Sequence, residues 1–431
     1  FGIVSGKTCT KYDVDNDELK ARMLGDTHDT TNNGTIKAGS MSGGIAGWVI
    51  SPQVQLKDVF NSGEVVTDIN LFKGNITDIG DIENLVDISN LNDIEGDYAG
   101  GIVGYVILKN PGTNGGDGII RHSDRVVSDI IMSSAGSSHK PVYTNTGKVY
   151  ADGSFAGGII GRGSVSLAEV FNAGEIQAKQ SFAGGIIGEL SYNKTDIGEP
   201  IILSASNDDG KSDHQIDEMV SYALNASDKA SSLYHNRGNV STINGAYAGG
   251  IAGAISWEAN NTGTKIHVTD MYNAGHVAAG LVTNWEFIEI TEDFSNADIS
   301  ITTKGIDNMS AGGIIGYAEW TTLEYRKDSI KNTIIDQTAL KDQDKFLPNM
   351  GNVLARDEAG GLIGSASGIT NNYDDVLIIN GINRGVVRTE YESAGGLLGQ
   401  GLLATIKTDS EVAEAMLDLK QNTEYDSFSN L

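Results

Sequence analysis

The stretch AGGIIG at residues 156–161 returns with small changes along the whole chain of 431 residues. In each copy a small residue is followed by two glycines, then by Ile or Leu, and a further glycine ends the unit. The eight copies begin at Ser42, Ala99, Ala156, Ala183, Ala248, Ala311, Ala359 and Ala394. An Asn-x-Gly tripeptide precedes each copy, and its asparagines are Asn32, Asn61, Asn145, Asn172, Asn236, Asn273, Asn349 and Asn383. This is therefore a repeat protein.

Each unit has the composition of two corners and two short strands. Asn-x-Gly predicts one corner, because Asn bonds its own backbone in turns and Gly takes the left-handed conformation. Segments between the corners, such as residues 174–180 with the sequence GEIQAKQ, alternate as strands do. One such unit cannot bury its own apolar side, so the copies must stack. The sequence predicts a mainly β fold, a parallel β-solenoid (β-helix) of eight recognisable coils with inserted loops, hairpins and short helices.

The glycine pair is the predicted structural motif of every coil. Glycine permits φ > 0 and removes Cβ where another strand must come close, and we expect both properties at each pair. The pairs are Gly43 and Gly44, Gly100 and Gly101, Gly157 and Gly158, Gly184 and Gly185, Gly249 and Gly250, Gly312 and Gly313, Gly360 and Gly361, and Gly395 and Gly396. The residue after each pair is always Ile or Leu, which predicts a shared apolar interior that contains Ile159, Ile186, Ile251, Ile314, Leu362 and Leu397.

Composition excludes several classes of protein. The chain has 57 acidic and 30 basic residues, a net charge of −27, which repels nucleic acid and anionic membranes and favours solubility or cation binding. No apolar run approaches the ~20 residues of a membrane-spanning helix. Gly numbers 55 without a three-residue period and Pro only 5, which excludes collagen and proline-rich linkers. The single Cys9 leaves the redox compartment undecided.

A second level of repetition relates the two halves of the chain. Six of the eight units have short spacings between tripeptide and hexapeptide, whereas the second and the sixth each contain a long insert. We infer a tandem duplication, with one four-coil block at 1–212, a second at 213–407 and a further block or helical extension at 408–431. Helical patches at 17–24, 216–224 and 410–419 accompany the blocks, and we expect them to pack on the side of the solenoid or to dock a partner.

The two long inserts, at 67–97 and 278–309, are the expected contact regions. In the first, aliphatic residues recur at every third position among acidic ones, and the insert has eight acidic residues and one Lys. The second contains 285–290, WEFIEI, and 299–303, ISITT, which predict a hairpin. Inserts of a solenoid map to one side, often the binding side. We expect a partner that is cationic, calcium-bridged or a neighbouring subunit.

A search for chemistry predicts no catalytic, cofactor-binding or metal residues. Asp13, Asp15 and Asp17 have the alternate spacing of a calcium loop, but Glu18 and Leu24 stand where such a loop needs Gly and Glu. Calcium binding at this segment is kept as the alternative. Residues 207–210, NDDG, predict a solvated turn, and His122, His214 and His235 lack neighbours at ligand spacing. Trp48, Trp257 and Trp320 follow hexapeptides and predict either packing under a loop, which we favour, or an outer row that grips sugars.

The combination of Asn-x-Gly with AGGIIG resembles the GLUG repeat, a short motif of bacterial surface and secreted proteins. The motif also occurs beside the catalytic domain of streptococcal immunoglobulin A metallopeptidases. The resemblance covers the eight hexapeptide regions and implies an extracellular solenoid in a large adhesin-like or scaffold protein. The metallopeptidase signature HExxH does not occur in the sequence.

Three functions stay open from the sequence. The first, which we favour, is a non-enzymatic structural or adhesive protein that forms or decorates a cell-surface fibre, with self-association or surface glycans and proteins as partners. The second is a non-catalytic ligand-binding module of a larger secreted enzyme. The third is a β-helical enzyme that acts on polysaccharide, which needs carboxylates clustered on one face of successive coils.

The two ends of the sequence also carry an expectation. Residues 1–6, FGIVSG, resemble the end of a preceding AGGIVG unit, and the helical patch at Ser410 falls where a third block would begin. An exposed end of a solenoid leaves apolar surface and strand edges uncovered. We therefore expect either further repeats in the same chain or head-to-tail stacking of separate chains.

Overall fold

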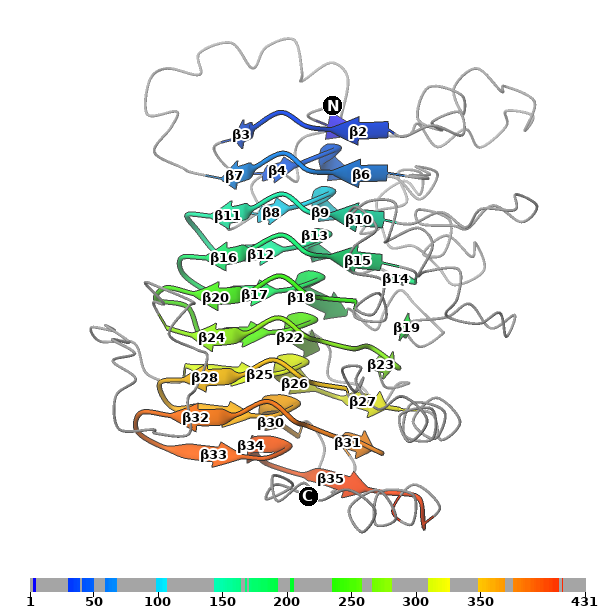
Figure 1. Cartoon of the computed structure of the whole chain (residues 1–431), viewed down its shortest axis with the longest axis vertical. Helices are drawn as coiled ribbons and strands as arrows, with labels where there is room; N and C mark the ends of the chain where they lie inside the picture. The colour runs from blue at the N-terminus through cyan, green and yellow to red at the C-terminus, as the bar shows by residue number, and fades with distance from the viewer. Residues whose placement is uncertain are drawn as a thin grey trace, which may run out of the picture.

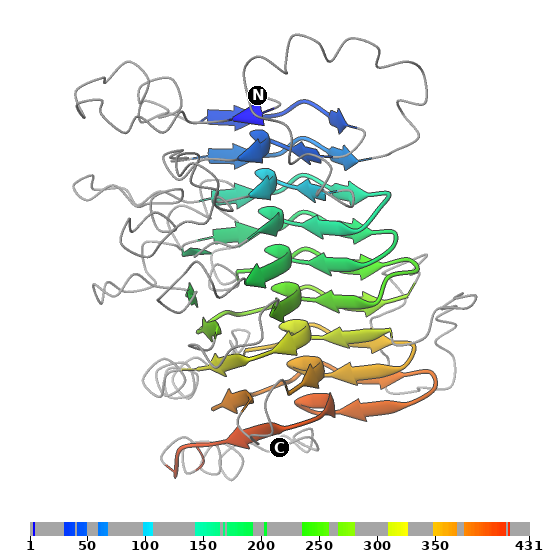
Figure 2. The same cartoon turned by 180° about the vertical axis from the view of Figure 1, so that it is seen from behind.

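Successive coils of the chain add one strand after another to the same sheets, as the computed structural model shows (Figure 1). The structure describes residues 3–4, 30–38, 41–49, 59–67, 98–106, 143–163, 167–168, 170–192, 202–204, 235–257, 266–280, 309–325, 348–368, 375–410 and 413. All strand pairs in this part are parallel, so the predicted parallel β-solenoid is confirmed. The strands stack from the N-terminus to the C-terminus in chain order, and the view from behind shows the same order (Figure 2).

The coils build five sheets, which we number in the order in which a coil reaches them. The first sheet holds the strands that end on the motif asparagines, and isolated bridges at the later asparagines continue it. Its strands are β2 Thr30–Asn32, β6 Val59–Asn61, β10 Tyr143–Asn145 and β15 Val170–Asn172. The second sheet follows the Asn-x-Gly corner. Its strands are β3 Ile36–Ala38, β7 Val65–Thr67, β11 Val149–Ala151, β16 Ile176–Ala178, β20 Val240–Thr242, β24 Val277–Ala279, β28 Val353–Ala355 and β32 Val387–Thr389.

The third and fourth sheets are formed by the hexapeptide itself, which turns between them at the glycine pair. The third sheet contains β4 Met41–Gly43, β8 Tyr98–Gly100, β12 Phe155–Gly157, β17 Phe182–Gly184, β21 Tyr247–Gly249, β25 Ser310–Gly312, β29 Glu358–Gly360 and β33 Ser393–Gly395. The fourth contains β1 Ile3–Val4, β5 Ala46–Val49, β9 Val103–Val106, β13 Ile160–Gly163, β18 Ile187–Tyr192, β22 Ala252–Trp257, β26 Ile315–Glu319, β30 Ile363–Ser367 and β34 Leu398–Gly401.

A fifth sheet extends the stack from the third coil onward, and the sequence pattern gave no indication of it. It consists of β14 Leu167–Ala168, β19 Ile202–Ser204, β23 Ile266–Thr269, β27 Thr321–Glu324, β31 Val376–Ile379 and β35 Ala404–Lys407. The strands of this sheet lack a common motif, and the segment between the hexapeptide and the strand varies from 4 to 13 residues.

Two apolar interiors lie inside each coil, separated at the hexapeptide. The small residue before the glycine pair packs in a narrow interior with aliphatic residues of the second sheet, such as Ala156 with Val149 and Ile176. The residue after the pair enters a wider interior between the first, fourth and fifth sheets. Ile159, Ile186, Ile251, Ile314 and Leu362 are almost completely buried there, and Leu397 of the last coil is partly buried. The predicted orientation of this position is confirmed, and each buried side chain contributes roughly 1.5–3 kcal/mol.

The N-terminal strand occupies a place in the stack in a different register from the one that the sequence match indicates. FGIVSG aligned with AGGIVG would put Ile3 opposite Ile45, but Ile3 pairs with Trp48 and Val4 with Val49. The strand β1 is therefore part of the fourth sheet, three residues further along than the motif predicts.

Several expectations fall outside the described residues. These are the helical patches at 17–24 and 216–224, both inserts between Thr67 and Tyr98 and between Gly280 and Met309, and the predicted hairpin. Of the third patch only Ser410 and Ala413 are described; both are helical, and the Ala413 N–H donates to the Asp409 carbonyl over 3.0 Å. The strand pairing runs without interruption from β18 to β22, across the expected block boundary at 212 and 213.

Candidate functional site: the asparagine and glycine rows

The eight motif asparagines form a hydrogen-bonded row through the interior of the solenoid. In each coil the side-chain Nδ2 donates to Oδ1 of the asparagine in the next coil. The seven distances lie between 2.7 and 2.9 Å, although the two partners are up to 84 residues apart in the sequence. The six asparagines from Asn61 to Asn349 are completely buried. The row therefore adds a side-chain hydrogen bond to the backbone pairing between every two neighbouring coils.

Every asparagine also closes its own corner. Its Nδ2 donates a second hydrogen bond to the carbonyl of the Gly two residues later, for example Asn172 to Gly174 over 2.9 Å. In six coils the N–H of that Gly donates back to Oδ1, as Gly174 does over 3.1 Å. An asparagine inside the row thus uses both N–H groups and both acceptor positions of its amide. A buried amide without partners would cost about 1–3 kcal/mol per unsatisfied group, so this complete pairing is what makes the buried position tolerable.

The glycine pairs are required by the approach of the next coil, while the expected positive φ is wrong. Among the described glycines only Gly280 has a positive φ, of 135°. A Cβ on Gly158, the second of its pair, would overlap the Gly185 carbonyl of the next coil and lie 2.5 Å from the Asn172 side chain. The same holds for the second glycine in seven of the eight pairs. A Cβ on the first glycine would overlap a carbonyl three residues later in its own coil.

The glycine of Asn-x-Gly is explained in the same way. The sequence assigned it to the left-handed conformation, which the structure contradicts. A Cβ on Gly174 would instead overlap the Gly147 carbonyl of the preceding coil and lie 2.7 Å from Asn145 Nδ2. Close packing of one coil on the next, with no room for a methyl group, therefore determines both glycine positions.

An outer row of side chains accompanies the third sheet. Tyr98, Phe155, Phe182 and Tyr247 occupy the same position in four successive coils and contact one another, with ring centroids 5.0–5.4 Å apart. Tyr105 stacks on Tyr98 and Tyr317 on Tyr247, both from the fourth sheet. Most of these rings stack face to face along the row, so their faces are occupied by each other. Sugars bind to ring faces, and this arrangement favours packing over a sugar platform.

Three carboxylates lie near the aromatic row, and each has a partner. Glu189 Oε2 is 2.5 Å from Arg162 Nε, and its Oε1 accepts a hydrogen bond from Ser256. Glu319 accepts from the Tyr317 hydroxyl over 2.5 Å. Glu358 accepts from the Ser310 hydroxyl, and burial raises the pKa of this carboxyl group.

These carboxylates stand at different positions of different coils. In the row of Glu189 the preceding and following coils have Arg162 and Ala254, and in the row of Glu358 they have Ser310 and Ser393. The arrangement differs from the clustered carboxylates on successive coils that a polysaccharide-cleaving β-helix needs.

The remaining candidate residues that are described are buried or structural. Trp48 and Trp320 are 6% and 8% exposed, so neither is part of an open row of rings. Trp320 packs in the wider apolar interior, whereas Trp48 is covered on the outer face of the fourth sheet, in register with Tyr105. The side chain of Trp257 lies outside the described part. His235 is buried, its Nδ1 accepts the Tyr272 N–H over 3.1 Å, and burial lowers its pKa to about 4.

His122, His214, the Asp13–Asp17 segment and the turn at 207–210 lie outside the described residues. Within the described ranges, no group of three or more His, Cys, Asp and Glu side chains is placed to bind a metal ion. No helix in the described part is long and apolar enough to cross a membrane.

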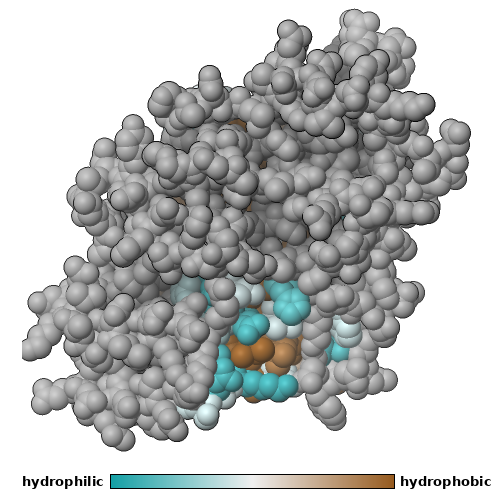
Figure 3. Space-filling view, turned by 90° about the vertical axis from the view of Figure 1, so that its right-hand side faces the viewer, coloured by the Kyte–Doolittle hydropathy of each residue, from teal (hydrophilic) through white to brown (hydrophobic). Residues whose placement is uncertain are grey.

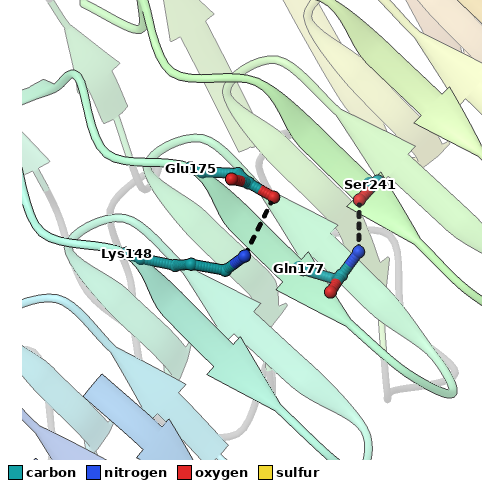
Figure 4. A network of polar contacts seen from close by, with 4 residues as sticks. All are labelled: Lys148, Glu175, Gln177 and Ser241. Carbon is teal, nitrogen blue, oxygen red and sulfur yellow. Dashed lines mark hydrogen bonds and ion pairs between the residues drawn. The ribbon is translucent and has the colours of Figure 1, made fainter. Parts of the chain in front are cut away.

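The outer face of the second sheet adds weaker contacts between coils. Lys148 forms an ion pair with Glu175 of the next coil at 3.2 Å, and Gln177 donates to Ser241 over 3.2 Å (Figure 4). Both partners of the ion pair are about two fifths exposed or slightly less. Solvent-exposed pairs of this kind contribute at most about 1 kcal/mol. These residues differ from coil to coil, unlike the asparagine and glycine rows.

Comparison with known proteins was made for the whole sequence. No family model and no curated protein matches it. Among solved structures it is similar to a crystal structure described as "a putative immunoglobulin A1 protease from Bacteroides ovatus", with 14% identity and a TM-score of 0.32 over 92% of this chain and 72% of that chain.

The sequence did not predict the contact between asparagines of neighbouring coils. It assigned these residues only to turns, a role that Asp, Ser or Gly can also fill. The signal was the presence of Asn at all eight copies. An amide has both a donor and an acceptor, and only Asn or Gln can bond to an identical neighbour on each side.

Proposed function

We propose that this chain is a non-enzymatic structural protein, a rigid acidic β-solenoid that carries inserted segments at the outside of a cell. The observation that carries the proposal is the use of the repeated residues. Every residue type that recurs in all eight units, Asn, Gly and the aliphatic residue after the pair, contacts neighbouring coils or the interior. The motif of the chain thus serves stacking, and stacking of this kind gives an extended scaffold.

The positions at which the chain leaves the stack support a display role. The corner between the second and third sheets consists of residues 152–154 in the third coil and 179–181 in the fourth. At the same corner residues 68–97 intervene in the second coil and 280–309 in the sixth. Both inserts therefore branch from one corner of the solenoid, four coils apart. A partner that contacts both would be cationic or calcium-bridged, since the first insert has eight acidic residues and one Lys.

The proposed location outside the cell is supported by the resemblance to GLUG repeats and by the acidic composition. The net charge of −27 keeps a long repeat protein soluble and repels anionic surfaces. Surface biotinylation of intact source cells tests this location, and labelling only after lysis would contradict it.

Replacing the inserts tests the display function directly. In one variant residues 68–97 and 281–308 are each exchanged for Asp-Gly-Ser, the corner of residues 152–154. We expect thermal unfolding at an equal or higher temperature, because a shorter loop costs less closure entropy. We also expect loss of binding to cationic proteins and glycans, measured with and without Ca²⁺.

Two controls accompany this experiment. An exchange of the exposed Gln180 for Ser, at the same corner in the fourth coil, should change neither stability by more than about 1 kcal/mol nor binding, because surface substitutions have small effects. Unchanged binding after replacement of both inserts would contradict the display role. Release of reducing sugars from a polysaccharide by the parent, abolished in Glu358→Gln, would show an enzyme instead.

A further inference from the structure

The two faces of the coil stack present complementary halves of the same contact. Inside the stack, the second glycine of each pair meets the next coil, and the glycine of Asn-x-Gly meets the preceding coil. Each coil therefore offers one glycine surface in each direction. The first and last described coils, at β2 to β5 and β32 to β35, each have one such surface without a described neighbour.

At both faces the motif glycine is present although no described coil covers it. Gly396 is partly exposed and no described coil follows it, whereas the same glycine in the seven other coils is closed by the next coil. At the opposite face, the nearest atom to a Cβ on Gly34 is Oδ1 of its own Asn32 at 3.7 Å. The described atoms leave room for a methyl group on Gly34, and no described coil closes Gly396, yet both positions have the residue that stacking needs.

The asparagine row has a direction, and its two ends match. Within the described part, Asn383 Nδ2 donates only to the Gly385 carbonyl, and Asn32 Oδ1 accepts only the Gly34 N–H. Among the described residues, one end of the row thus has a donor without an acceptor and the other an acceptor position without a donor. Strand edges show the same relation, because β32, β33 and β34 end their sheets on one side and β3 and β4 on the other.

The last coil also exposes apolar side chains. Tyr391, Leu402 and Ile406 are 63%, 63% and 46% exposed, and they are the exposed large hydrophobic residues of the described part. Figure 3 views the side toward which β31 and β35 run, where apolar atoms reach the surface between hydrophilic ones near the C-terminal end of the stack. Exposed strand edges together with apolar surface are the properties of an interaction face.

We propose that the last coil docks the first coil of a second copy of this chain, head to tail. Asn383 Nδ2 then donates to Asn32 Oδ1 of the second copy, Gly396 lies under its Asn32 side chain, and its Gly34 lies over the Gly385 carbonyl. The strands β32 and β33 pair with β3 and β4 in the parallel register of the other coils. Such an interface is heterologous and does not close, so it leads to filaments.

The strand β1 competes with this docking. Along the fourth sheet, the register relates Trp48 and Val49 of β5 to Gln400 and Gly401 of β34. Ile3 and Val4 pair with the same Trp48 and Val49, so β1 occupies the place that β34 of the docking copy would take. Docking must displace Ile3 and Val4 from β5, and it forms the contacts of a complete coil in their place. The strand β1 therefore acts as a cover that slows assembly.

The test compares glycine substitutions in the whole 431-residue chain. Light scattering over a concentration series and negative-stain images measure assembly, and calorimetry measures stability. We expect parent filaments to form at high concentration, and deletion of residues 1–6 to raise the apparent association constant at least about tenfold. Gly396→Ala and Gly34→Ala should each keep the parent unfolding temperature and lose assembly.

Matched substitutions inside the stack act as controls. Gly361→Ala and Gly63→Ala stand at the equivalent positions one coil inward, where a Cβ overlaps a neighbouring carbonyl, and both should lower the unfolding temperature. The proposal is overturned if the chain stays monomeric even after deletion of residues 1–6. It is also overturned if Gly396→Ala forms filaments as readily as the parent. This inference rests on the proposed scaffold function but fails separately from it. A monomer whose inserts still bind partners would overturn only the docking.

Discussion

The asparagine row and the outer row of the third sheet run along the same coils but differ in the number of residue types that they contain. The first contains one residue type in eight coils, whereas the second contains Met41, Tyr98, Phe155, Phe182, Tyr247, Ser310, Glu358 and Ser393. The asparagines bond to one another and lie against the glycine backbone of the neighbouring coils. The outer side chains meet other side chains, and four of the eight are partly exposed to solvent. A backbone neighbour cannot adjust to a new shape, while a side-chain neighbour can change rotamer. Contact with the backbone of the next coil is therefore what keeps a position constant in this solenoid.

The largest expected effect comes from filling the space between two coils. Gly184→Val would place atoms against the Ile187 carbonyl and 2.6 Å from the Gly253 nitrogen of the next coil. Neither group can move without breaking the parallel strands around it. We expect a loss of more than about 4 kcal/mol in the free energy of unfolding, or no folded protein, measured by chemical denaturation.

Lys179→Val is the matched control for that substitution. Lys179 lies five residues earlier, at the corner after β16, and forms an ion pair with Asp152 at 2.6 Å while its side chain is 40% exposed. Its replacement should cost at most about 1 kcal/mol. Equal losses for Gly184→Val and Lys179→Val would show that backbone contact is not the constraint.

Breaking one rung of the asparagine row should have the next largest effect. Asn236→Ala leaves Nδ2 of Asn172 without its acceptor and Oδ1 of Asn273 without its donor, both in a buried position. Two unsatisfied groups at about 1–3 kcal/mol each predict a loss of roughly 2–6 kcal/mol. A double substitution of Asn172 and Asn236 measures the coupling between rungs, and strict additivity would contradict a cooperative row.

Acidic pH should lower the free energy of unfolding through His235. The folded pKa of about 4 lies below the ordinary value of 6.5, because burial disfavours the charged form. The unfolded chain therefore binds more protons between these values, so the stability contribution is complete above pH 6.5 and is lost as the pH falls toward 4. We expect about 2 kcal/mol less stability at pH 5 than at pH 7 from this residue. His235→Asn should remove this part of the pH dependence, and an unchanged pH profile would contradict it.

The outer row should be the most tolerant. Phe182→Leu removes ring contacts with Phe155 and Tyr247 at 5.3 and 5.4 Å but leaves an apolar, half-buried side chain in place. We expect a loss of roughly 1 kcal/mol by chemical denaturation, well below that of Asn236→Ala. A loss larger than that of Asn236→Ala would reverse the comparison between the two rows.

The sequence by itself determined the repeat, the number of coils and the side chains that point inward. Period and composition were sufficient for these, because a short unit with one apolar side has no stable arrangement except stacking. The burial of Ile159, Ile186 and Ile251 followed from their constant place after the glycine pair.

Only the tertiary structure decided why the motif residues are constant. A repeated glycine can be required by its backbone conformation or by lack of space for a side chain. The closeness of Gly158 to Gly185 and Asn172 shows that lack of space is the cause here. The bond from Asn61 to Asn145 crosses a segment whose length is unrelated to the repeat, so local pattern could not place the two side chains together. The fifth sheet and the register of β1 were hidden for the same reason, since a strand partner outside the motif is chosen by stacking geometry and not by nearby residues.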